Sequence, residues 1–234
     1  LANYVNAYVS STDPLKKAFG KALQTYGYYA QKQFNSADEL PNITPLDLRD
    51  VTASTVADYQ SDVRLYRGTK KAELSQTTLY LDSGTSIRTY LTDIASTVNT
   101  NNLYMKYTVD GVAEKVKVKK TSAGEYYGEI PDIPANKLSK MYNITFVEGD
   151  TQITDTVVYG AFSYIYATLQ STASANRKYL AKSLYKYSLA AEALLDSLPP
   201  VEDPTPDSSS SKPDSSSSKP DSSSSKPSSS SQGG

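Results

Sequence analysis

The segment KALQTYGYYAQ at residues 21–31 decides how this chain is organised, because a segment near the other end, KSLYKYSLAAE at residues 182–192, matches it. The paired positions are Lys21 with Lys182, Leu23 with Leu184, Tyr26 with Tyr187, Gly27 with Ser188, and Ala30 with Ala191. An internal repeat indicates how the segments between its two copies are organised. The two copies therefore predict a structural unit that occurs once on each side of the middle of the chain.

Both copies are expected to lie in long helices. Around the first copy, apolar residues recur at steps of three and four and predict one buried helical face, formed by Phe19, Ala22, Leu23, Tyr26, Ala30 and Phe34. Asp13 is the expected N-cap and Pro14 the first helical residue. Shorter helices are expected in the LANYVNAYV segment before it and at residues 161–170, with a long helix at 173–197. At each end of the chain, a short helix and a long helix are therefore expected to form a helical hairpin.

Gly27 needs an explanation, since glycine inside a helix costs about 1 kcal/mol relative to alanine. A small residue recurs at the paired position, Ser188. We therefore predict that the two long helices approach each other closely at Gly27 and Ser188. The alternative is a helix break at Gly27.

Between the hairpins the hydrophobic period changes to two. Segments such as LYMKYTV at 103–109 and YNITFVEG at 142–149 alternate and are separated by turn residues, with Asp110-Gly111 as a hairpin signal. Tyr142, four residues after Leu138, is compatible with a tyrosine corner. The predicted class is α+β, with an antiparallel immunoglobulin-like β-sandwich at 58–159 inserted between helical hairpins at 1–57 and 160–198.

Residues 199–234 differ from the rest in composition. They repeat Pro-Asp-Ser-Ser-Ser-Ser-Lys and contain almost no apolar side chain, so they cannot bury enough surface to offset the entropy of ordering. We predict a disordered linker, which with the start at Leu1 indicates a piece of a longer protein. The alternative is a low-complexity end with no mechanical role.

Composition excludes several classes of function. The chain has no cysteine and no histidine, which removes thiol nucleophiles, histidine-dependent triads and cysteine or histidine metal sites. Its 24 basic and 25 acidic residues nearly cancel, so nucleic acid is not an expected partner. No apolar run is long enough to span a bilayer. Tyrosine, at 20 residues against four phenylalanines and no tryptophan, supplies most of the aromatic surface.

The helix and strand segments together resemble a module of large surface proteins of gut Firmicutes. The resemblance rests on a helix of the form L-x-x-Y-G-x-x-A-Q-x-x-F, here Leu23 to Phe34, and on a closing helix of the form A-L-Y-x-Y-x-x-A-A. It covers residues 1–198. Gln24 and Thr25 depart from the family's apolar-Asn pair, and Ser188 lies at a variable position. The resemblance implies an exported, non-catalytic part of a polysaccharide-adherence apparatus, as in ruminococcal starch adherence, and it implies no particular site residues.

We therefore expect an extracellular module on the bacterial cell surface that binds a polysaccharide such as an α-glucan and has neither catalytic activity nor a cofactor. The alternative is a structural spacer or protein-docking module whose partners are neighbouring surface-protein domains. Stacking against sugar rings requires exposed aromatic side chains. The candidate binding residues are Tyr28 and Tyr185 on the helices and Tyr126 and Tyr127 in the strand region; alternation places the last two on opposite faces, so one of them is expected in the core.

Two acidic clusters are alternatives with different chemistry. Glu125, Glu129 and Asp132 are the candidates for a glycosidase pair, although acidic residues near strand ends are ordinarily solvated turn groups. Calcium could be bound by oxygens of the segment EGDTQITD, with Glu148, Asp150 and Asp155 as donors. That segment lacks the spacing of an EF-hand, and an ordinary turn is the favoured interpretation.

Overall fold

The computed structural model describes residues 2–34, 43–61, 70–81 and 84–199. These residues belong to one compact unit that ends at Pro199. The predicted linker from residue 200 onward, and residues 62–69 of the predicted sandwich, lie outside the described residues. The α+β class is confirmed: helices from the two ends of the chain accompany two antiparallel sheets that are arranged like a sandwich.

The described part of the chain contains four α-helices: α1 (Ala2–Val9), α2 (Pro14–Phe34), α3 (Ala161–Gln170) and α4 (Ala175–Asp196). Both predicted hairpins are present. The N-cap prediction is also correct, because the Oδ1 atom of Asp13 accepts hydrogen bonds from the backbone N–H groups of Leu15 at 2.9 Å and Lys16 at 3.3 Å. Among the described residues, no helix is both long and apolar enough to cross a membrane.

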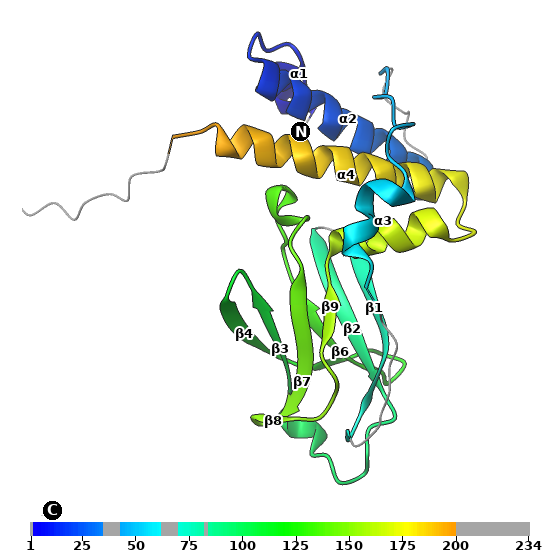
Figure 1. Cartoon of the computed structure of the whole chain (residues 1–234), viewed down its shortest axis with the longest axis vertical. Helices are drawn as coiled ribbons and strands as arrows, with labels where there is room; N and C mark the ends of the chain where they lie inside the picture. The colour runs from blue at the N-terminus through cyan, green and yellow to red at the C-terminus, as the bar shows by residue number, and fades with distance from the viewer. Residues whose placement is uncertain (1, 35–42, 62–69, 82–83, 200–234) are drawn as a thin grey trace, which may run out of the picture. The chain divides into compact units, whose positions relative to one another are not determined.

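The duplicated segments pack directly on each other, as Figure 1 shows for α2 and α4. The paired tyrosines stack, with the Tyr26 and Tyr187 ring centroids 5.5 Å apart and the ring planes 9° from parallel. Phe19 lies 5.7 Å from Tyr187 and 5.3 Å from Tyr8 of α1, so the rings form a continuous chain from α1 to α4. Burial raises the pKa of Tyr26 to about 12.

The prediction about Gly27 is wrong. A Cβ atom at Gly27 would have no neighbouring heavy atom within 4 Å, and α2 continues through it without a break. A close approach occurs two helical turns earlier, at Gly20, and involves α1: a Cβ there would lie 2.8 Å from the Cβ of Tyr8. Phe34 is likewise not buried as expected: it is 59% exposed, because it is the last residue of α2.

The strands form two sheets. The first sheet has the order β1 (Glu73–Leu81), β2 (Thr85–Thr92), β6 (Tyr126–Ile130) and β5 (Lys119–Lys120). The second has the order β4 (Val112–Lys117), β3 (Leu103–Val109), β7 (Tyr142–Glu148) and β8 (Thr151–Gln152), and β9 (Val157–Tyr159) also pairs with β7. Short 3-10 helices occur at Ala53–Tyr59, Thr100–Asn102 and Ala135–Lys137.

The Asp110-Gly111 hairpin is confirmed between β3 and β4. Both residues have positive φ, 50° and 81°, which the tight turn requires. The inward faces of the sheets and one face of α3 share a single core, whose fully buried side chains include Ile87, Met105 and Phe162. The sheets pack closely at Gly128 of β6, where a Cβ would lie 2.4 Å from the Sδ atom of Met105 in β3.

Candidate functional site

The outward face of the first sheet carries a cluster of aromatic and charged side chains. Strand alternation directs Tyr80 of β1, Arg88 of β2 and Tyr127 of β6 away from the core. Antiparallel pairing then brings them together, since Tyr80 pairs with Ser86, Arg88 with Glu129, and Tyr90 with Tyr127. We call this set the outer-sheet cluster: Tyr80, Ser86, Arg88, Tyr90, Tyr127 and Glu129.

The Arg88 guanidinium links the rings of this cluster. Its central carbon lies 3.5 Å from the centroid of the Tyr80 ring and 5.2 Å from that of Tyr127. The Tyr127 ring in turn stacks on Tyr90, with centroids 5.5 Å apart and planes 30° from parallel. Cation–π contacts and stacking fix these rings in position. Tyr80 nevertheless remains 38% exposed and available to a ligand.

Glu129 connects the cluster through hydrogen bonds. Its Oε1 accepts from Nε of Arg88 at 2.7 Å and from Oγ of Ser86 at 3.1 Å, and its Oε2 accepts from Nζ of Lys119 at 2.6 Å. Burial by itself would raise the pKa of Glu129, but the hydrogen bonds from Lys119, Arg88 and Ser86 outweigh it and hold the pKa below its ordinary value. The carboxylate is therefore ionised at neutral pH, with both oxygens occupied.

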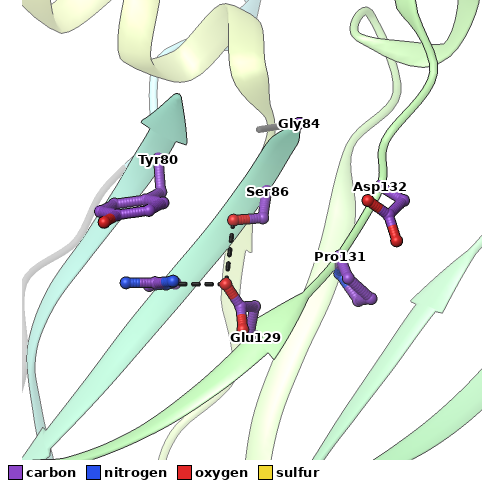
Figure 2. Close-up of a pocket in the computed structure, with 7 residues that line it drawn as sticks. Tyr80, Gly84, Ser86, Glu129, Pro131 and Asp132 are labelled. Atoms are coloured by element: carbon purple, nitrogen blue, oxygen red, sulfur yellow. Dashed lines mark hydrogen bonds and ion pairs between the residues drawn. The ribbon is translucent and has the colours of Figure 1, made fainter. Parts of the chain in front are cut away.

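A small pocket of about 110 Å³ opens beside this carboxylate. Figure 2 shows Ser86 and Glu129 pointing towards each other, with the Tyr80 ring on one side and Asp132 on the other. Asp132 has a φ of 49°, in the left-handed region that asparagine and aspartate tolerate better than most residues. The lining carries two carboxylates, Glu129 and Asp132, and one cation, Arg88, while Lys119 pairs with Glu129 from outside the lining. The pocket thus offers polar groups without an excess of positive charge.

The structure does not assemble the other acidic residues into a site. In the described part of the chain, no group of three acidic, histidine or cysteine residues could hold a metal ion. Asp150 and Asp155, predicted as calcium ligands, face lysines instead: Asp150 lies 3.0 Å from Lys115, and Asp155 lies 4.0 Å from Lys70. Glu148 accepts a hydrogen bond from the backbone N–H of Asn99 at 2.8 Å.

The four tyrosines predicted as binding residues do not come together. Tyr127 belongs to the outer-sheet cluster, whereas Tyr126 faces the opposite way and packs against the core, as alternation required. Its hydrogen bond with Thr100 lowers the pKa of Tyr126. Tyr28 of α2 is half-buried, with its ring 5.2 Å from that of Tyr29.

Tyr185 is not the exposed ring that the sequence suggested. It is half-buried, and its ring lies 5.1 Å from that of Phe162, because α3 crosses this part of α4 and covers it. Tyr185 therefore contributes to the interface between the helices and the sandwich. It is poorly placed for stacking against a ligand.

Sequence reasoning missed Tyr80, Arg88 and Tyr90 as members of a site. A signal was present, since alternation in the segments TTLYL and SIRTYLT places all three on the solvent side of their strands. The sequence did not show the pairing register of the strands. Sliding one strand by two residues keeps each side chain on the same face of the sheet but gives it different cross-strand neighbours. The cluster exists only in the observed register.

Comparisons of the chain with protein-family models, with curated proteins and with solved structures find no match in any of the three. The geometry of the outer-sheet cluster therefore carries the functional argument.

Proposed function

We propose that this chain is a non-catalytic, extracellular module of a bacterial cell-surface protein, and that it binds polysaccharide on the outward face of its first sheet. The observation that carries the proposal is the outer-sheet cluster, in which fixed tyrosine rings lie beside an ionised carboxylate and a guanidinium. Sugar rings present an apolar C–H face and a rim of hydroxyls. Rigid aromatic rings suit the face, and charged donors and acceptors suit the hydroxyls.

A neutral, starch-like glucan is the ligand that we propose for this face. The pocket is lined by two carboxylates and one cation, and that cation is paired with Glu129, which favours an uncharged polymer over a polyanion. The resemblance to adherence modules and the Ser/Pro-rich repeats of residues 200–234 support the same setting, a module held on a tether outside the cell. We also propose that the sandwich is immunoglobulin-like, with the buried Tyr142 as its tyrosine corner.

The chemistry of Glu129 supports binding over catalysis. A glycosidase needs one carboxylic acid with a raised pKa to protonate the leaving oxygen. Glu129 has the opposite perturbation, and its two oxygens are already engaged by three donors. An ionised carboxylate that is engaged by three donors suits the positioning of the neighbouring side chains that contact a ligand.

The proposal is tested by retention of the purified chain on insoluble starch, with cellulose and xylan in parallel. We expect retention on starch that falls at least tenfold in Tyr80→Ala, a loss of about 1.4 kcal/mol of binding free energy. The matched control is Tyr104→Ala, since Tyr104 is a half-exposed tyrosine beside two lysines on the outward face of the second sheet. Equal retention of the two variants, or no retention of the wild type, contradicts the proposal.

A second candidate function is protein docking, and one observation favours it. A groove of about 560 Å³ lies between α2 and α4, and its lining is mainly apolar, with Ala18, Ala22, Leu46 and the exposed Leu189 among its residues. An apolar groove on a helical layer suits a partner helix. Loss of partner binding in Leu189→Asp, with starch retention unchanged, would establish docking as a separate activity.

A further inference from the structure

A second pocket lies beside the first, at the junction of the first sheet with the helices. Its volume is about 300 Å³. It is lined by Leu79, Tyr80 and Leu81 of β1, Gln33 and Phe34 of α2, Tyr164 of α3, and Arg177 and Leu180 of α4. In the described part of the chain β1 is the first strand of its sheet, so this pocket runs along the edge of the sheet.

The lining of the second pocket combines an apolar floor with aromatic walls. Leu79 and Leu180 are buried and form the floor, and the Tyr164 ring and the exposed Phe34 ring provide apolar walls. Such a combination, with few polar groups, is typical of small-molecule sites. It differs from the first pocket, where ion pairs predominate.

Among the described residues that line this second pocket, Arg177 is the one with a charged side chain. Its Nε donates a hydrogen bond to the Tyr164 hydroxyl at 3.2 Å, which orients the guanidinium. Within the described residues no carboxylate pairs with Arg177, so its two terminal nitrogens keep their donors for a ligand. A guanidinium presents these donors in a fixed fork, which matches a pair of adjacent oxygens.

Tyr80 joins the two pockets, because it is a lining residue of both of them. Arg88 covers one face of the ring at 3.5 Å, and the side chain is still 38% exposed. A ligand that fills both pockets must therefore pass over Tyr80. The tyrosine that the proposed function places in the site is also the point at which the two pockets meet.

We infer that the two pockets form one extended site for a linear run of sugar units, with Tyr80 at its centre and Arg177 as a second anchoring residue. This inference rests on the proposed function and narrows it: the ligand is an oligomer or polymer long enough to fill both pockets, and a short saccharide occupies only part of the site. Contacts in the second pocket then add to those in the first, because the linked units bind at a high effective concentration.

The test is isothermal titration calorimetry with maltotriose and maltoheptaose as probes. For the wild-type chain we expect maltoheptaose to bind at least tenfold more tightly than maltotriose, equivalent to about 1.4 kcal/mol. In Arg177→Ala the ratio of the two affinities should fall towards one. Arg177 is exposed, so the variant is expected to fold normally, which circular dichroism and the unfolding midpoint will verify.

Arg49→Ala is the matched control, because Arg49 is an exposed arginine outside both pockets. It should leave the affinity ratio unchanged. Equal affinities of the wild type for the two probes, or an unchanged ratio in Arg177→Ala, overturn the extended site while the proposed function stands. Failure of both probes to bind, together with failure of starch to retain the chain, overturns both proposals.

Discussion

The outward faces of the two sheets carry the same arrangement of residue types in different surroundings. On the first sheet, Glu129 is held by two cations, Arg88 at 2.7 Å and Lys119 at 2.6 Å, next to an aromatic ring. On the second sheet, Asp150 is held by Lys106 at 3.3 Å and by Lys115 at 3.0 Å. There too a tyrosine ring lies under one of the cations, 4.4 Å from the ammonium of Lys115.

Burial distinguishes the two arrangements. The Glu129 side chain is 11% exposed, whereas that of Asp150 is 84% exposed. Charges held close together in solvent interact weakly, while a carboxylate withdrawn from water depends on its partners. Similar ion pairs therefore lie in a largely buried pocket on the first sheet and on a solvated surface on the second sheet. Burial and register, more than residue type, make the first face a candidate site.

The largest expected effect concerns the point where the two sheets meet. Gly128 lies between Tyr127 and Glu129 of the outer-sheet cluster and faces inward onto Met105. In Gly128→Ala the added methyl must displace Met105, and overpacking of this kind costs about 3 kcal/mol. Urea denaturation should show a correspondingly lower free energy of unfolding.

The matched control for that change is Gly27→Ala. The chemical change is identical, but a Cβ at Gly27 meets no atom within 4 Å, and the residue lies inside a helix. Alanine is favoured over glycine there by about 1 kcal/mol, so the variant should be more stable than the wild type. Effects of the same sign in the two variants would contradict the packing described for both positions.

The next largest effect is expected for Glu129→Gln. Removal of the charge leaves Arg88 and Lys119 without their anion on a largely buried face. Breaking a fully buried pair costs several kcal/mol; because Lys119 is 58% exposed, we expect a smaller loss of about 2 kcal/mol in the free energy of unfolding. Urea denaturation at neutral pH measures it. A loss close to zero would mean that this ion pair is no stronger than a surface pair.

The contribution of Glu129 to stability should depend on pH in a defined direction. Its pKa is lower in the folded chain than the value of about 4.3 in an unfolded chain, so folding favours the ionised form. The resulting stabilisation is complete above the unfolded value and is lost as the pH falls through the folded pKa. The difference in unfolding free energy between the wild type and Glu129→Gln should therefore shrink from neutral pH to about pH 3. A difference that grows on acidification contradicts this sign.

Local signals predicted the helices and hairpins well. The Asp13 cap, the apolar periodicity and the duplicated segments are properties of neighbouring residues, and so is the Asp110-Gly111 turn, whose positive φ values only a few residue types tolerate. Two expectations that required knowledge of the neighbouring helix were wrong. The close approach lies at Gly20 and not at Gly27, and α3 covers Tyr185.

The candidate site could be predicted only in part. Alternation separates Tyr126 from Tyr127, which the sequence allowed, but only the structure shows that Tyr126 is the one that packs against the core. The sequence also indicated Glu129 as a candidate site residue, but as a member of a catalytic glycosidase pair. The pairing of Glu129 with Arg88, forty-one residues earlier in the chain, is set by the register of β2 and β6. Together with the hydrogen bond from Lys119 of β5, which has the largest lowering effect, the hydrogen bonds from Arg88 and Ser86 lower the pKa of Glu129 and convert a candidate acid into an ionised carboxylate.

The smallest expected effect comes from Asp150→Asn and completes the comparison. This change is the counterpart of Glu129→Gln: it removes one carboxylate charge that two cations hold. Because Asp150 is 84% exposed, water solvates Lys106 and Lys115 once the charge is gone. The unfolding midpoint in urea should remain within experimental error of the wild type, and so should retention on starch. A midpoint shift as large as that of Glu129→Gln would show that burial does not separate the two faces, and the case for placing the binding site on the first sheet would lose its energetic basis.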